Sequence, residues 1–434
     1  AGTFTTLTAS GVFTGASLDI SGDIDVDGTT ETDVLTINGS QFNYKAFGSD
    51  SIMIGDTTTG TIDAANFNVG LGVNVFAALT SGDDNVAVGY GALTANTTGS
   101  DNVAIGKVAL DANTTASNNT AVGNASMTAN TTGASNTAVG SSSLNANTTA
   151  ANNTAIGYAS LEANTTGTRN TAVGAGGLDS NTTGNDNTAV GYNSGSAITT
   201  GEQNTSLGSA TLDANTTGNY NTAIGTSALG ANTTGSTNTA VGVGALDTNT
   251  TGSDNVGVGL NALDDNTTGS SNTAVGRSSL ANNTTAANNT AVGYYALEAN
   301  TTGASNTCLG DSAGSSITTG SHNVLIGRNT GVDTIALTTG GHNVVLGNFS
   351  RTGTADAYYA IGLGYNITAA GGYTTVGRDT SDIRAAHGVA TWATVSDERY
   401  KKDIVDSTAG LSFINALQPR TFKYKTLGEL PETF

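Results

Sequence analysis

Acidic side chains in the central part of the chain are the most obvious groups that could do chemistry. Two carboxylates that face each other across a groove can cleave a glycosidic bond. The central acids, however, fall at turn positions and form no recurring pair; they are Asp83, Asp84, Asp186, Glu202, Asp254, Asp264 and Asp265. We therefore interpret them as solvated turn residues and predict no enzyme that acts on an external substrate.

The residue types that bind metals form no constellation either. Three histidines, His322, His342 and His387, and a single cysteine, Cys308, are spread over the second half of the chain. A zinc site needs several such ligands held together, and the glycine-aspartate nonapeptide of calcium-binding β-rolls is absent. We expect no metal and no cofactor, and one cysteine gives no disulfide framework.

Aromatic residues gather near the C-terminal end of the chain. Such side chains can bind a sugar by stacking, or they can fill and cap a core. Both interpretations stay open for this group, which comprises Tyr358, Tyr359, Tyr365, Tyr373 and Trp392.

Most of these residues lie in or beside a sequence repeat. An asparagine recurs every 17 residues from Asn85 to Asn323 without an insertion. A typical unit is "NTAVGYYALEANTTGAS", which begins at Asn289. A fixed period of this length is typical of a solenoid, in which each coil buries its apolar face against its neighbours. Counting from the anchor asparagine, position 3 is nearly always alanine, position 4 is always aliphatic and position 5 is always glycine.

The segment "NTAVG" predicts a short β-strand that ends where only glycine fits. Glycine, asparagine and threonine at this density argue against helices. Each unit therefore suits a coil of two short strands with tight corners. Parallel coils rise about 4.8 Å each, so the repeat would span roughly 70 Å. Stacked asparagines can pair their side-chain amides along the axis.

Two further positions vary together. Position 9 is usually leucine and position 12 is usually asparagine, but two units have glycine and isoleucine instead, as Gly195 with Ile198 and Gly314 with Ile317. One large apolar side chain is lost and another appears three residues later. We infer that both positions border the same interior and that its volume is being restored.

Each coil offers few apolar side chains, so the core of one chain is expected to be thin. The alanine column, on the face opposite the aliphatic column, would let another chain approach closely. We therefore predict an all-β parallel solenoid, or β-roll, in an intertwined homotrimeric fibre.

The composition limits the partners. The chain has 434 residues, 59 glycines and a formal net charge of −20, which disfavours nucleic acid and anionic membranes. The longest apolar runs are far shorter than a membrane span, so no membrane insertion is expected. The opening "AGTFTTLTAS" has neither a secretory signal nor an initiator methionine, which suggests a fragment or a processed form.

Changes in composition divide the chain into four segments. Residues 1–84 are a β-rich adaptor or shaft, residues 85–342 are the repeat, and residues 343–395 are a β-rich closing region. Residues 396–434 contain both prolines and six of the fourteen basic residues. In this last segment "AGLSFINAL" predicts a short helix with one apolar face, and "RTFKYK" predicts a strand, so the segment is expected to be small and α+β.

The last segment resembles the start of the intramolecular chaperone domain of phage tailspikes and tail fibres, the endosialidase chaperone family. The residues that carry the resemblance are "SDERYKKDI", from Ser396 to Ile404, and "GLSFINALQPRTFKYK", from Gly410 to Lys425. The preceding "GRDTSDIRAAHGVATWATV" also looks like the usual lead-in. The repeats separately resemble "NTAVG" arrays of phage fibres and bacterial surface proteins.

The resemblance implies a domain that forms trimers, guides the folding of a β-fibre and then cuts itself off before an aspartate. Carried over, the bond between Ser396 and Asp397 would be cut, with Ser396 as the nucleophile and Lys401 as its activator. A serine hydroxyl needs a base at neutral pH, and a lysine can serve if its pKa is lowered. A tethered target bond needs no substrate pocket.

Three functions remain in view. The first is a phage tail fibre, located on the virion, that binds a glycan or an outer-membrane component of the host surface and contacts other tail proteins. The second is a bacterial surface adhesin or extracellular filament. The third, a glycan-degrading tailspike, would require the carboxylate pair that the repeat does not show.

Overall fold

The computed structural model describes residues 35–37, 40–42, 44–47, 51–55, 64–332, 335–389 and 393–394. The chain forms two compact units. The first comprises Ala1–Ser278 with Asn283–Thr285, and the second comprises Ser279–Asn282 with Ala286–Phe434.

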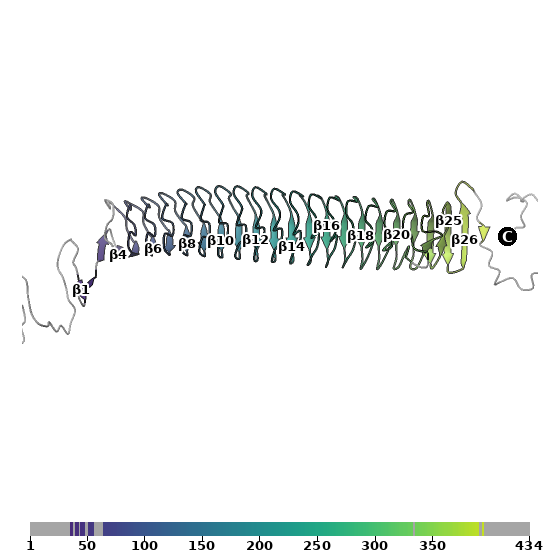
Figure 1. The fold of residues 1–434 in the computed structure, drawn as a ribbon, viewed down its shortest axis with the longest axis horizontal. Helices are drawn as coiled ribbons and strands as arrows, with labels where there is room; N and C mark the ends of the chain where they lie inside the picture. Colours follow the sequence, from purple (N-terminus) through teal and green to yellow (C-terminus); the bar gives the residue numbers. More distant parts are fainter. Residues whose placement is uncertain are drawn as a thin grey trace, which may run out of the picture. The chain divides into compact units, whose positions relative to one another are not determined.

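The first unit is a ladder of short strands, one per coil (Figure 1). Each strand of the regular coils covers positions 2 to 4 of the repeat, where the β-branched residues lie. The strands are β1 (Leu35–Ile37), β2 (Ser40–Phe42), β3 (Tyr44–Phe47), β4 (Ser51–Gly55), β5 (Val69–Gly72), β6 (Val86–Val88), β7 (Val103–Ile105), β8 (Thr120–Val122), β9 (Thr137–Val139), β10 (Thr154–Ile156), β11 (Thr171–Val173), β12 (Thr188–Val190), β13 (Thr205–Leu207), β14 (Thr222–Ile224), β15 (Thr239–Val241), β16 (Val256–Val258) and β17 (Thr273–Val275).

The second unit continues with strands of the same kind and ends in longer ones. They are β18 (Thr290–Val292), β19 (Thr307–Leu309), β20 (Val324–Ile326), β21 (Val344–Leu346), β22 (Arg351–Thr352), β23 (Ile361–Tyr365), β24 (Thr368–Ala369), β25 (Tyr373–Arg378), β26 (Ser381–Ala386) and β27 (Ala393–Thr394).

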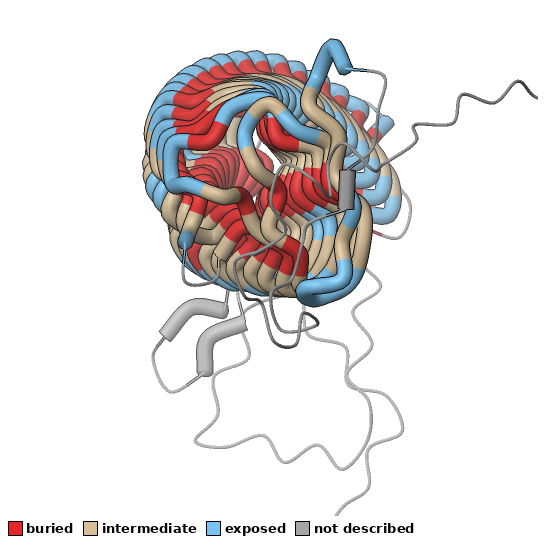
Figure 2. Tube along the Cα trace, turned by 90° about the vertical axis from the view of Figure 1, so that its right-hand side faces the viewer, coloured by how far each residue is buried: buried red, intermediate tan, exposed pale blue. Residues whose placement is uncertain are grey.

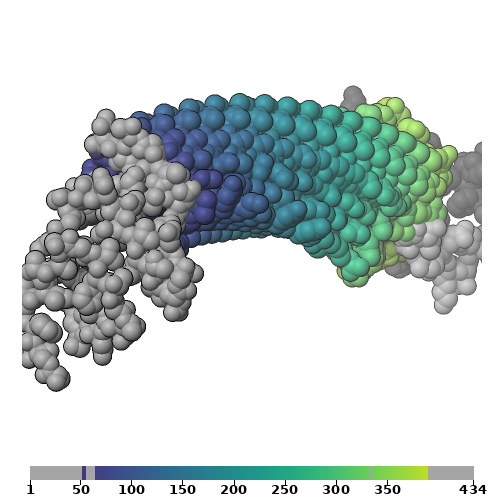
Figure 3. Space-filling model, turned by 60° about the vertical axis from the view of Figure 1, so that its left-hand side comes forward, coloured from purple at the N-terminus to yellow at the C-terminus, as the bar shows by residue number. Residues whose placement is uncertain are grey.

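Neighbouring strands pair in parallel and in register, so that each residue lies beside its equivalent 17 residues away. Thr154 pairs with Thr171, and Ile156 pairs with Val173. The predicted parallel β-solenoid of 17-residue coils is therefore confirmed, and no helix occurs among the described residues. Within each unit the buried and exposed positions recur at the same place in successive coils (Figure 2). The coils of the first unit, purple to teal in Figure 3, form regular rows of side chains.

The interior contains alanine, leucine and asparagine rather than the aliphatic column. Ala155 at position 3 and Leu161 at position 9 are fully buried, whereas Ile156 at position 4 is 40% exposed. The prediction that the alanine column would face another chain is therefore wrong. Successive side chains of a strand point to opposite faces, so one residue of each three-residue strand turns inward. Leucine and asparagine already fill the interior, and only a small side chain fits beside them.

The two asparagine columns stabilise one corner of each coil, and the predicted amide ladders are confirmed. Asn102 at position 1 donates from Nδ2 to Asn85 Oδ1 at 3.0 Å, and Asn113 at position 12 donates from Nδ2 to Asn96 Oδ1 at 3.0 Å. Both amides also donate to the carbonyl of Ala116, at 2.9 and 3.0 Å. These asparagines are buried, so the ladders satisfy polar groups that would otherwise be costly to bury.

The predicted coupling of positions 9 and 12 is also confirmed. Ile198 and Ile317 are fully buried. A Cβ atom added to Gly195 would lie 3.1 Å from Ile198 Cδ1, so the isoleucine occupies the space that leucine fills in other coils.

The second strand that we expected in each coil is absent from the described repeat. The leucine column has a left-handed backbone, with φ of 52° at Leu161, and position 7 does too, with φ of 53° at Ala159. Residues in this conformation cannot extend into a strand. The coils are nevertheless hydrogen bonded there, because Leu161 N donates to Gly177 O at 2.9 Å and Ala163 N donates to Asp179 O at 2.9 Å.

The ladder extends beyond the regular repeat. β4 pairs in parallel with β5 upstream of Asn85. In the second unit the longer coil between Asn323 and Asn343 does not end the stack, because β20 pairs in register with β21 and β21 with β23. The four-segment division of the chain stays a prediction. The predicted helix after Ala409 and the strand "RTFKYK" lie outside the described residues.

Each unit also contains an antiparallel pair of strands. β3 pairs antiparallel with β4, and β26 pairs antiparallel with β25. β27 continues the antiparallel pairing on the other side of β26.

Candidate functional site

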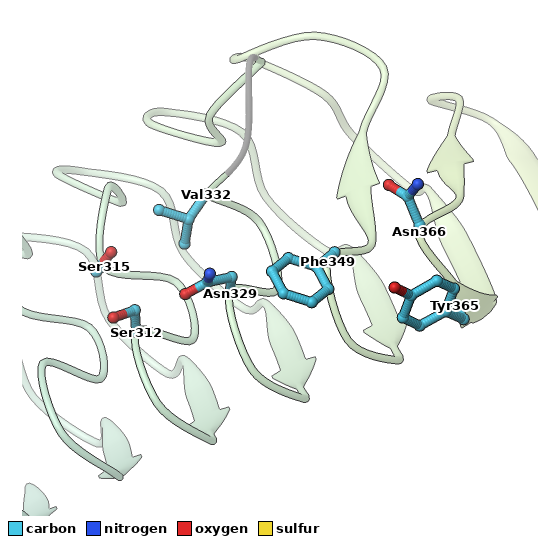
Figure 4. Close-up of a pocket in the computed structure, with 7 residues that line it drawn as sticks. All are labelled: Ser312, Ser315, Asn329, Val332, Phe349, Tyr365 and Asn366. Atoms are coloured by element: carbon cyan, nitrogen blue, oxygen red, sulfur yellow. The ribbon is translucent and has the colours of Figure 1, made fainter. Parts of the chain in front are cut away.

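The residues that the chaperone resemblance singled out, Ser396, Asp397 and Lys401, lie outside the described residues. The structure instead draws attention to a groove in the second unit. It has a volume of about 530 Å³ and is lined by Ser312, Ser315, Asn329, Val332, Phe349, Tyr365 and Asn366 (Figure 4).

The stacking of coils places most of the lining residues in one row. Ser312, Asn329, Phe349 and Asn366 all occupy position 7 of successive coils, and each has a left-handed backbone. The backbone N–H of each of these positions donates to a carbonyl one coil upstream, as from Phe349 to Arg328 at 2.9 Å. The row therefore repeats with the coils, at a spacing of about 4.8 Å.

Two aromatic rings form the apolar part of the groove. The rings of Phe349 and Tyr365 meet edge to face, with centroids 6.1 Å apart. Arg328 lies over the Phe349 ring at 5.6 Å and Arg378 lies over the Tyr365 ring at 5.9 Å. Tyr365 remains 45% exposed. Edge-to-face ring contacts and cations over ring faces are both favourable, so these residues stabilise one another in this arrangement.

The polar part of the groove is oriented by neighbouring charges. Asn366 Oδ1 accepts from Arg351 Nη1 at 3.0 Å, and Asn366 Nδ2 donates to Asp379 Oδ1 at 3.0 Å. Ser312 Oγ donates to Asp311 Oδ1 at 3.0 Å. In Figure 4, Asn329 lies between Ser312 and Phe349. Amides and hydroxyls beside exposed rings are the groups that recognise an uncharged polyhydroxy ligand.

The aromatic residues that the sequence grouped together fall into separate sets: Tyr358 and Tyr359 contact each other, with ring centroids 6.2 Å apart, whereas Tyr365 contacts Phe349. Tyr359 stacks on His342 at 5.3 Å, and His342 stacks on His322 at 4.7 Å, in the column that precedes the anchor asparagine. Tyr373 instead lies under Arg384, and Trp392 lies outside the described residues. Sequence reasoning missed Phe349 and Asn329 because the repeat varies freely at position 7; the return of phenylalanine at Phe349 was the one available signal.

Two of the central acids show where carboxylates lie in the described coils. Asp186 is ion paired with Arg169 one coil away, at 2.6 Å between Nε and Oδ1, and this hydrogen bond lowers the pKa of Asp186. Asp264 lies in the column after the leucines, where burial raises its pKa, and Asp265 and Asp247 raise it further.

No group of three or more histidine, cysteine, aspartate or glutamate residues in the described ranges could hold a metal ion. Cys308 is buried in an alanine slot, and burial raises the pKa of its thiol, so the nucleophilic thiolate is disfavoured. The described part of the chain also contains no helix long and apolar enough to cross a membrane.

Comparison with known proteins adds one finding. Residues 396–433 match the family described as the chaperone of endosialidase, so the predicted resemblance of this segment is confirmed. No match was found among curated proteins. The chain thus joins a parallel β-solenoid to a C-terminal segment that is similar to the endosialidase chaperone.

Proposed function

We propose that this chain is a structural and adhesive fibre protein, a phage tail fibre that attaches the virion to its host. The observation that carries the proposal is the order of the two parts, a β-solenoid followed by the chaperone-like segment at residues 396–433. A chaperone segment of this family implies a fibre of several chains, and we propose three. Other tail proteins would anchor the fibre, and the host surface would supply its receptor.

The groove in the second unit is the proposed receptor site, and a saccharide of the host surface is the proposed ligand. The exposed part of the Tyr365 ring, which is 45% exposed, can contact the apolar face of a sugar ring. Asn329 and Ser315 can then exchange hydrogen bonds with its hydroxyls. The flanking arginines already lie over aromatic rings, and two are paired with acids: Arg328 with Asp311 at 3.3 Å and Arg378 with Asp379 at 3.4 Å. We therefore favour an uncharged saccharide.

The first test is binding of the purified chain to an array of bacterial surface glycans. We expect saturable binding, and we expect the Tyr365→Ser variant to bind the glycan about tenfold more weakly or worse. For comparison, stacking of a nucleic-acid base on an aromatic ring contributes about 1–3 kcal/mol to binding. Tyr192→Ser is the matched control, because Tyr192 occupies the same repeat position and is 63% exposed in the first unit. Equal loss in both variants, or no loss in either, would refute the groove as the receptor site.

Self-cleavage between Ser396 and Asp397, with Lys401 as the activating base, is the second part of the proposal. It rests on the family match, since these residues lie outside the described structure. Intact mass under denaturing conditions tests it: wild type should end at Ser396, and a Ser396→Ala variant should keep its full length. A wild-type chain of full length would withdraw these assignments and leave the solenoid unaffected.

A further inference from the structure

The aliphatic column at position 4 of the repeat faces outward, although every coil has an apolar residue there. Ile105, Val139 and Ile156 in the first unit are 39%, 37% and 40% exposed. The second unit presents the same column through Leu309 and Ile326. A single exposed aliphatic residue is ordinary, but a continuous apolar strip on a folded protein marks an interaction site.

This strip, which we call the outer strand face, consists of positions 2 and 4 of strands β5 to β17 in the first unit. Position 2 is threonine or valine and position 4 is valine, isoleucine or leucine throughout, so no charged residue lies in it. The acidic residues in the described part of this unit all lie in other columns. In a chain with a net charge of −20, this face is where two copies can meet without electrostatic repulsion.

The dimensions of the outer strand face suit an interface between proteins. Thirteen strands, β5 to β17, spaced about 4.8 Å apart, make it roughly 60 Å long, and three residues at about 3.3 Å make it about 10 Å wide. Its projected area is therefore about 600 Å², close to the roughly 800 Å² that each partner buries in a stable complex. The short side chains repeat in register along the face, so the faces of neighbouring copies can pack closely along their whole length.

We propose that the outer strand face is the interface between copies of this chain, and that three copies turn it toward a common axis. Threonine and β-branched side chains would then fill the space between chains, while alanine and leucine fill each chain. This inference extends the proposed fibre and locates its interface on the face opposite to the one that the alanine column suggested.

Cysteine labelling of the full chain tests the interface without assuming how the copies are oriented. In an Ile156→Cys variant the new thiol should be protected from a bulky maleimide under native conditions, at least tenfold relative to the unfolded chain. Thr166→Cys is the matched control, because Thr166 lies in the same coil and is exposed; its thiol should react freely. The native Cys308 is buried.

Ile156→Cys that reacts as fast as Thr166→Cys would overturn the proposed interface, because Ile156 is 40% exposed in the single chain. That outcome is distinct from failure of the proposed function, since glycan binding and the number of chains are measured separately. Protection of Ile156→Cys that disappears in a variant carrying Val139→Glu and Val173→Glu would support the interface further, provided that the β-sheet circular dichroism is unchanged.

Discussion

In one coil, Gly195 and Ile198 replace the usual leucine at position 9 and asparagine at position 12. This replacement keeps the volume of the core but removes a hydrogen bond between neighbouring coils. In a regular coil the asparagine at position 12 donates to the one before it, as Asn181 Nδ2 does to Asn164 Oδ1 at 2.9 Å. Ile198 has no such donor, and Asn181 Oδ1 is buried without a hydrogen-bond partner. A buried acceptor left unpaired costs about 1–3 kcal/mol.

Converting this coil to the regular pattern should therefore stabilise it. We expect the double substitution Gly195→Leu with Ile198→Asn to slow amide hydrogen exchange in residues 187–203 by an amount equivalent to about 1 kcal/mol or more of local stability. Leucine fits the left-handed backbone at this position in most other coils.

The single variants are the controls. Gly195→Leu alone should destabilise the coil, because its side chain would collide with Ile198, and Ile198→Asn alone should leave a cavity beside Gly195. If the double variant exchanges as fast as the worse single variant, the two positions do not share one space and the inference of compensation is wrong.

At the scale of the element, one column of each coil brings acids close together. Asp213 and Asp247 flank Gly230, and a Cβ atom added there would lie 3.6 and 2.6 Å from their Oδ1 atoms. Burial raises the pKa of both carboxyls, and Asp247 raises the pKa of Asp213 further. The folded state therefore binds more protons than the unfolded chain between the ordinary carboxyl pKa of 3.8 and the raised values.

Acidification should consequently stabilise this part of the solenoid. Stability from these groups is fully present below the ordinary pKa and is lost as pH rises through the raised one. We expect the melting temperature to increase as pH falls from 7 toward 4.5, and Asp213→Asn with Asp247→Asn to raise the melting temperature at pH 7 and flatten the dependence. A melting temperature that falls steadily over this range, or an unchanged slope in the variant, would contradict the account.

The sequence was sufficient to predict the repeating coils, but not to predict which side chains of each strand face the interior. The period placed Asn102 and Asn113 in ladders, and the pairing of Gly195 with Ile198 located the interior, because both follow from repetition within one chain. The inward turn of Ala155 and outward turn of Ile156 depend on how much space Leu161 and the asparagines leave. Hydrophobicity alone favours the wrong residue there.

The candidate groove was less accessible to sequence reasoning. The group of aromatic residues near the C-terminal end left sugar binding and core capping both open. Only the stacking of coils brings Phe349 beside Tyr365 and places Asn329 in the same row as Phe349. The arginines over these rings lie in other coils. Contacts of this kind depend on the register after the longer coil, which the period did not specify.

In the proposed fibre, several copies of a thin-cored chain associate through their outer strand faces. Most coils of the first unit bury one leucine, one alanine and two asparagines. In a single chain the aliphatic column of the outer strand face is partly exposed, and in the proposed fibre another copy would cover it. Association would therefore add apolar burial that a single chain lacks.

Native mass spectrometry of the purified chain at micromolar concentration measures how many copies associate. We expect one dominant species that contains three copies of the chain. A dominant monomer under the same conditions would contradict it, because the outer strand face would then be exposed to water in the functional protein.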